Sequence, residues 1–136
     1  MRGAIDAARE NKCDGVIGFG GGSSMDTAKV IACLINSEQR LENIYGIDMV
    51  KGARVPLALL PTTAGTGSEV TNISVITSDD DQKMGVVARQ LYADIAVLDA
   101  ALTLSMPRHV TNATGIDAMV HAIESYTSKL KKNPLS

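Results

Sequence analysis

A run of glycines and small polar residues at positions 18–27 is the first segment of the chain that could bind a ligand. Consecutive glycines let the backbone turn at positive φ and approach a ligand without an intervening Cβ. Free N–H groups at the start of the helix predicted to follow, together with the helix dipole, favour a phosphate. Ser23 replaces the third glycine of G-x-G-x-x-G, and Lys29 lies too far into the helix for a P-loop. The alternative is a tight strand-to-helix turn in which Ser23 and Asp26 form a variant capping box.

Residues 61–69 form a second loop of small residues, and it also leaves the carboxyl end of a predicted parallel strand. Ligands of open α/β sheets bind in the crevice outside these strand ends, so both loops are expected to face one crevice. Thr66 and Glu69 also match a capping box, which contributes about 1 kcal/mol to a helix start. Capping and ligand contact are compatible, because different hydroxyls can serve each. Together the two loops favour a nucleotide site.

Asp117 and His121 stand four residues apart in a predicted helix, so their side chains lie about one turn apart. They flank an apolar stripe and are expected near its buried boundary. The pair could share a metal ion, or it could be an i, i+4 ion pair that contributes about 0.3 kcal/mol at a surface. Two ligands do not hold a divalent ion tightly, because protein sites normally supply three or four. The other histidine, His109, is predicted to be solvated at a helix start.

Alternating strands and helices must position these residues. Continuous apolar runs, typical of parallel strands covered on both faces, predict strands at 14–19, 55–60 and 95–98. Helices are predicted at 2–12, 24–35 and 107–130, and a hairpin is predicted from 72–77 and 83–88 with a turn at 79–82. The order of elements indicates an α/β fold with a mostly parallel sheet. The stripe of the last helix comprises Ile116, Met119, Val120, Ile123 and Leu130.

Composition narrows the class of protein. The chain has 136 residues, 45% of them hydrophobic, and a net charge of −2, which argues against a dedicated nucleic-acid or anionic-membrane binder. The longest apolar run, 30–35, is far shorter than the roughly 20 residues of a membrane helix. Cys13 and Cys33 lack metal-finger spacing and suggest a reducing compartment. A cytoplasmic protein of one domain, or a piece of one, is expected.

Three segments taken together resemble the iron-containing (group III) alcohol dehydrogenases. They are GGGSSMDTAK at 20–29, PTTAGTGSEVT at 61–71 and ATGIDAMVHAIESY at 113–126. Their order and spacing match the family, and the resemblance covers essentially the whole chain. It implies a Rossmann-like dinucleotide-binding domain, an all-helical domain and a site in the cleft between them. It also implies reversible oxidation of alcohols with NAD or NADP and one divalent ion, iron or zinc.

The resemblance implies site residues of two kinds. The cofactor positions are Gly21, Gly22, Ser23 and Asp26 at the pyrophosphate, Thr62, Thr63 and Thr66 beside the nicotinamide half, Lys83 near a ribose and Leu104 near the same cleft. The metal ligands are Asp117 and His121. A divalent ion on the substrate oxygen would stabilise the alkoxide as a Lewis acid, while the loops hold the nicotinamide for hydride transfer. No side chain is nominated as a general base.

The resemblance also predicts an incomplete enzyme, because family chains are much longer. We expect residues 1–106 to be a partial dinucleotide-binding domain and residues 107–136 to be the truncated start of the helical metal-binding domain. The first β-α-β portion and two histidine metal ligands of the family have no counterpart here. A strand edge and apolar faces left uncovered predict poor solubility or loose folding.

The function expected from the resemblance is a metal-dependent, NAD(P)-linked alcohol dehydrogenase acting on a small alcohol or aldehyde. The full-length family implies a homo-oligomer, with no nucleic-acid or membrane partner. One alternative is a non-catalytic nucleotide-binding remnant that needs partner chains. Another is a related activity, namely glycerol dehydrogenase, maleylacetate reductase or hydroxyacid–oxoacid transhydrogenase. The residues select neither the substrate nor NAD over NADP.

Overall fold

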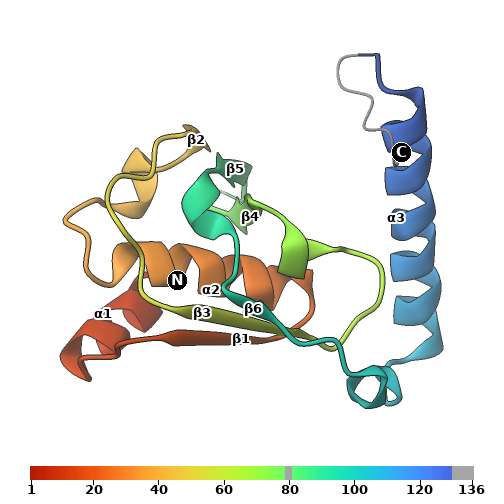
Figure 1. Ribbon diagram of the computed structural model, residues 1–136, viewed down its shortest axis with the longest axis horizontal. Coiled ribbons are helices and arrows are strands. Elements are labelled where there is room, and N and C mark those ends of the chain that lie inside the picture. The colour runs from red at the N-terminus through yellow and green to blue at the C-terminus, as the bar shows by residue number, and fades with distance from the viewer. Residues whose placement is uncertain (79–80, 130–136) are drawn as a thin grey trace.

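The computed structural model describes residues 1–78 and 81–129 and is a mixed α/β fold (Figure 1). Its helices are α1 (Arg2–Glu10), α2 (Gly22–Leu34) and α3 (Arg108–Thr127). Its strands are β1 (Val16–Gly20), β2 (Gly46–Ile47), β3 (Leu57–Pro61), β4 (Ile73–Thr77), β5 (Lys83–Val87) and β6 (Ile95–Ala96). Short 3-10 turns join them at Leu41–Asn43, Ser68–Val70, Arg89–Leu91 and Ala100–Thr103. No helix among the described residues is long and apolar enough to cross a membrane.

The strands form two separate sheets. The first has the order β1-β3-β6, and both of its pairings are parallel, with Gly18 opposite Leu59 and Leu59 opposite Ala96. The second has the order β2-β5-β4 and contains the predicted hairpin, in which Val75 of β4 faces Gly85 of β5 in antiparallel pairing. Part of the predicted turn, residues 79–80, lies outside the described residues. The predicted parallel sheet and the predicted hairpin are both present, and they share no strand.

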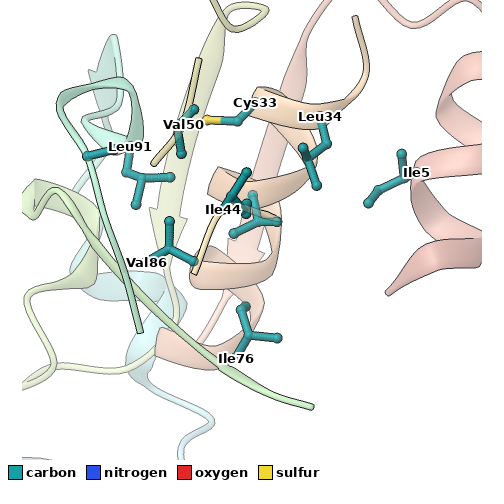
Figure 2. Packing of buried hydrophobic residues seen from close by; sticks show 10 residues of the cluster. Ile5, Cys33, Leu34, Ile44, Val50, Ile76, Val86 and Leu91 are labelled. Carbon is teal, nitrogen blue, oxygen red and sulfur yellow. The ribbon is translucent and has the colours of Figure 1, made fainter. Parts of the chain in front are cut away.

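Helix α2 lies between the two sheets and carries the core of the protein (Figure 1). Towards β1 and β3 it packs through one cluster, which consists of Met25, Ala28, Ala32, Ile35, Val55, Leu57 and Leu59. Towards the hairpin it packs through a second cluster, drawn in Figure 2, in which Val30, Cys33 and Leu34 meet side chains that include Ile44, Ile76, Val86 and Leu91. Because both sides of α2 are buried, the position of its amino end is fixed against both sheets.

The continuous apolar runs are typical of strands covered on both faces, but among the described residues one face of the parallel sheet is open, in line with the expected uncovered apolar faces. Successive strand side chains point to opposite faces, and α2 covers only one face of this sheet. Ile17 is 72% exposed and Phe19 is 58% exposed on β1. The strand predicted at 95–98 contains only two residues in β6, and Ile95 is 58% exposed at this sheet edge. The expected uncovered apolar surface is therefore present.

Helix α3 forms where the periodicity predicts it, but its apolar stripe is not buried. No residue of α3 is buried, and the stripe residues Ile116 and Met119 are 62% and 64% exposed. Leu130, the last predicted member of the stripe, lies outside the described residues. Periodicity reports which side of a helix is apolar, and no described element packs along that side here. His109 is exposed in the first turn of α3, as predicted.

Neither predicted capping box forms. Helix α2 begins at Gly22 with Gly21 as its N-cap and no side-chain cap, so Ser23 lies inside the helix. The Ser68–Val70 turn has Gly67 as its N-cap, and the Thr66 hydroxyl accepts only a long bond of 3.4 Å from the Ser68 N–H. The carboxylate of Asp26 is instead used by partners far away in the sequence, which are described below.

Candidate functional site

One cavity, of about 470 Å³, is lined by four parts of the chain. They are the glycine turn (residues 18–27), the threonine loop (residues 61–69), the hairpin of β4 and β5, and α3. It lies at the amino end of α2, on the side of that helix where the hairpin packs. Seven of the residues singled out from the sequence line it, namely Gly22, Ser23, Asp26, Thr66, Lys83, Asp117 and His121. The first and last of these residues, Gly22 and His121, are 99 positions apart in the sequence. The structure thus places the glycine turn and the Asp/His helix on the same side of the parallel sheet.

The glycine turn is closely fitted to the threonine loop. A Cβ on Gly21 would lie 3.4 Å from Cγ2 of Thr63, and a Cβ on Gly22 would lie 3.1 Å from Cγ2 of Thr66. The Thr62 N–H donates to the Gly20 carbonyl at 2.9 Å, which joins the two loops directly after their strands. The amino end of α2 therefore opens beside threonine side chains without a side chain of its own in the way. A helix amino terminus of this kind favours an anion.

Thr63 lines a second cavity, which the threonine loop shares with the residues that follow β6. This cavity, of about 430 Å³, is bordered by Gly65, Asp99 and Thr103 as well. The Thr63 hydroxyl is buried and has no hydrogen-bond partner within the described part of the chain. Buried hydroxyls are almost always hydrogen bonded, so this atom is suited to a polar group of a ligand. Its environment fits the expectation that this loop touches a cofactor.

A buried lysine that the sequence reasoning passed over lies beneath the cavity. The Lys29 side chain is 0% exposed, and its ammonium donates to Ser68 Oγ at 2.9 Å, to Thr71 Oγ1 at 3.1 Å and to the Ile73 carbonyl at 2.8 Å. Burial lowers the pKa of Lys29, and the neighbouring Asp26 carboxylate opposes that change. The available signal was a lysine in an otherwise apolar stretch of helix, between Ala28 and Val30.

Asp26 makes its bonds to the protein itself. Its Oδ1 accepts from Ser68 Oγ at 2.6 Å and lies 3.4 Å from Lys29 Nζ, while its Oδ2 accepts from the Val75 N–H at 2.8 Å. Both carboxylate oxygens are therefore occupied at the edge of the cavity. This arrangement assigns Asp26 a bonding role between α2 and the hairpin, in place of the helix cap expected from its spacing.

Helix α3 meets the threonine loop at Gly65. A Cβ at this glycine would lie 2.0 Å from the Thr114 carbonyl oxygen, and its φ of +152° lies in the region that favours glycine. The contact places Asp117 and His121, one and two turns further along α3, at the cavity. Their side chains face each other with Asp117 Oδ1 3.7 Å from His121 Nε2, and both are about half exposed. This is the geometry of the i, i+4 pair that the spacing predicts.

The donor set at α3 supplies part of a metal site. An aspartate oxygen and an imidazole nitrogen are suitable ligands for zinc or iron. The residues at 1–78 and 81–129 contain no group of three or more histidine, cysteine, aspartate or glutamate side chains placed to hold an ion. The pair therefore fits a divalent ion in kind but supplies too few ligands to hold it tightly.

Three of the expected cofactor residues line neither cavity, and one of them, Gly21, is the N-cap of α2 directly before Gly22. Leu104 follows the Ala100–Thr103 turn and is 84% exposed. Thr62 is half-buried and borders neither cavity, although its backbone bond to Gly20 fixes the loop. The structure thus does not bring the side chains of Thr62 and Leu104 into either cavity with the remaining cofactor positions.

The amino-acid sequence matches known proteins over most of its length. A model of the family described as iron-containing alcohol dehydrogenase matches residues 1–100. Sulfoacetaldehyde reductase of Bilophila wadsworthia is 47% identical over 122 residues, which are 89% of this chain and 32% of that protein. The chain spans about a third of the length of the curated relatives it matches.

The fold also matches solved structures, and the chain again covers about a third of the length of each. A crystal structure of 1,3-propanediol oxidoreductase superposes with a TM-score of 0.91 at 34% identity, covering 98% of this chain and 35% of that one. Sulfoacetaldehyde reductase of Bifidobacterium kashiwanohense, solved in complex with NAD⁺, gives a TM-score of 0.85 at 35% identity over 94% of this chain and 35% of that one. The motifs, the fold and the family match agree, and the chain belongs to the iron-containing alcohol dehydrogenase family.

Proposed function

We propose that this chain is part of an oxidoreductase that transfers hydride between a small alcohol and NAD or NADP with the help of a divalent metal ion. The observation that carries the proposal is the one cavity lined by Gly22 and Ser23 of the glycine turn and by Asp117 and His121 of α3. A phosphate-binding turn and a pair of metal donors facing the same space are what hydride transfer to a nicotinamide requires. The similarity to a reductase solved with NAD⁺ supports the choice of cofactor.

The cofactor would lie along the threonine loop. We place its pyrophosphate at Gly21, Gly22 and Ser23, where the amino end of α2 is open and no Cβ intervenes at the two glycines. The buried Thr63 hydroxyl would receive a hydrogen-bond partner from the ligand. Lys83, an exposed cation at the rim of the cavity, would face a ribose. Thr66 lines the same cavity as the glycine turn and α3.

Asp117 and His121 would hold the ion, iron or zinc, together with ligands from outside the described residues. When bound, such an ion acts as a Lewis acid for the alcohol oxygen. This chain would orient the metal donors relative to the cofactor, because the contact between Gly65 and Thr114 fixes α3 against the threonine loop. Holding the two reacting groups at a set distance is worth several kcal/mol of the barrier, on the order of 7–11 at the upper end.

The same proposal assigns residues 1–106 to a partial dinucleotide-binding domain and residues 107–136 to the beginning of a helical metal-binding domain. It also places the enzyme in the cytoplasm as a homo-oligomer. The second candidate is a non-catalytic nucleotide-binding remnant. The observation in its favour is that the described residues supply only two donors to the metal site.

Calorimetric titration of the chain with NAD⁺ and with NADP⁺ tests the cofactor site. We expect one-to-one binding with Kd on the order of 1 mM, because only part of the cofactor is enclosed. Gly22→Val should abolish this binding, since the new side chain would press on Thr66. Gly85→Val is the matched control, because a Cβ at Gly85 meets nothing within 4 Å. Equal binding by wild type and Gly22→Val would refute the pyrophosphate placement.

NADH absorbance tests whether the chain is catalytic by itself. Addition of Zn²⁺ or Fe²⁺, NAD⁺ and a primary alcohol to the chain should give NADH if the chain is catalytic alone. NADH formation would exclude the non-catalytic remnant, whereas NAD⁺ binding without NADH formation would show that the described residues bind the cofactor but do not complete the catalytic site.

A further inference from the structure

Lys29 is bonded to three successive points on the segment that leaves the threonine loop. Its ammonium contacts Ser68 Oγ, Thr71 Oγ1 and the Ile73 carbonyl, all within 3.1 Å. These acceptors extend from the Ser68–Val70 turn to the first residue of β4. One side chain of α2 thus fixes the path of the backbone between the loop and the hairpin.

Asp26, one turn before Lys29 on α2, extends the same network. Its carboxylate accepts from Ser68 Oγ at 2.6 Å and from the Val75 N–H at 2.8 Å. Its backbone carbonyl accepts from Ser74 Oγ at 2.9 Å. The bonds from this single turn of helix therefore reach from residue 68 to residue 75.

The network joins the amino end of α2, on one side of the cavity, to residues 66–83 on the other. Gly22 and Ser23 lie at the amino end of α2, one turn before Asp26. Thr66 lies two residues before Ser68, and Lys83 pairs with Thr77 at the end of β4. The hairpin sheet shares no strand with the parallel sheet. Apolar packing between α2 and the hairpin has no directional preference, whereas hydrogen bonds at set distances do.

We propose that Lys29 is a positioning residue, which holds Thr66 and Lys83 at a fixed distance from the glycine turn. The proposal rests on the cofactor site described above. Burial of an ammonium carries a desolvation penalty, which an apolar side chain such as methionine would not carry. The lysine instead donates directed hydrogen bonds to residues that line the cavity opposite α2. Its lowered pKa reflects the same burial.

The experiment compares Lys29→Met with Lys51→Met, which removes an exposed lysine, and with wild type. Amide hydrogen exchange followed by mass spectrometry measures local opening, and calorimetry measures the Kd for NAD⁺. In Lys29→Met we expect exchange at residues 66–77 to rise at least tenfold more than exchange in β1 and β3. We also expect the Kd to rise about tenfold at a temperature where the variant is folded, which is 1.4 kcal/mol. Lys51→Met should match wild type in both measurements.

A merely structural role predicts a different pattern. A uniform rise in exchange across the chain, or a local rise with an unchanged Kd, would overturn the proposal. If Lys29→Met does not fold, Ser68→Ala replaces it, since it removes one acceptor and keeps both charges. Ser68→Ala should raise exchange at the same residues to a smaller extent, and no local rise would count against Lys29. If wild type binds no NAD⁺, the proposed function fails, while the exchange data still decide whether Lys29 fixes this segment.

Discussion

Gly65 and Thr114 approach so closely that a Cβ on the glycine would lie 2.0 Å from the carbonyl oxygen of the threonine. This contact joins the threonine loop to α3, a helix that has no buried residue of its own. Asp117 follows Thr114 by three positions, so the place of the Asp/His pair depends on this contact. No side chain other than hydrogen fits between the two backbones.

Gly65→Ala is expected to displace α3 and to destabilise the chain by about 2–3 kcal/mol, through backbone strain and the loss of this contact. Gly67→Ala is the matched control. Gly67 also has a positive φ, of +63°, but a Cβ there meets nothing within 4 Å, so about 1 kcal/mol is expected. Urea unfolding gives both free energies, and amide exchange in α3 reports its displacement. Equal costs for the two variants would show that the contact with Thr114 is unimportant.

The ion pair between Arg54 and Asp94 predicts a loss of stability in acid. Asp94 accepts from Arg54 at 2.6 Å and 2.9 Å and from the Leu57 N–H at 2.8 Å, and these bonds lower its pKa to about 2. A carboxylate whose pKa is depressed in the folded state stabilises the fold above its unfolded pKa of about 3.9. That stability is lost as the pH falls from about 5 through 2.

Asp94→Asn should therefore lower the free energy of unfolding by about 1 kcal/mol at neutral pH and reduce its change on acidification. Asp14→Asn, at an exposed carboxylate, is the control and should leave the acid profile unchanged. Urea midpoints measured across the acid range provide the test. An Asp94→Asn profile parallel to that of wild type would contradict the assignment.

Zinc binding tests the Asp/His pair independently of the cofactor. Because two donors are supplied, we expect Zn²⁺ to bind the chain weakly, with Kd on the order of 0.1–1 mM. His121→Ala should weaken binding at least tenfold, and His109→Ala, which changes an exposed histidine in the first turn of α3, should leave it unchanged. Calorimetry or the imidazole resonances in NMR measure both. Equal losses from the two variants would indicate nonspecific binding.

The uncovered face of the parallel sheet predicts a solubility effect. Ile17 is 72% exposed, so Ile17→Lys should raise the soluble concentration of the chain while changing its free energy of unfolding by less than about 0.5 kcal/mol. Leu57→Lys, on the neighbouring strand, is the contrast, because Leu57 is 1% exposed and the variant should not fold. A soluble concentration unchanged by Ile17→Lys would argue against association through this face.

The sequence predicted the helices and the longer strands well because they depend on local patterns, but it did not predict the two-residue strand β2. The hairpin at 72–88 and the helix that carries Asp117 both follow from periodicity. Burial was predicted less well, because it depends on which surfaces have a partner. The apolar stripe of α3 and Ile17 on β1 show the required pattern but lie open.

The polar network could not be predicted from spacing. Asp26 and Ser68 are 42 positions apart, and no local rule links a residue of a helix to a hydroxyl so far along the chain. The local spacing of Asp26 suggests a capping box, but in the fold its carboxylate accepts hydrogen bonds from Ser68 and Val75 instead. Lys29 belongs to the glycine-rich motif, but only the fold shows that its ammonium is enclosed.

Enclosure of α2 between two sheets restricts how the protein can change over evolution. Its turns face two unlike sets of neighbours, because some of its buried residues pack towards the parallel strands and others pack towards the hairpin. At each buried position, a replacement that is too large or too small for its own cluster is destabilising. In a saturation library, this helix should tolerate fewer amino acids per position than α1 or α3, whose outer sides contact solvent.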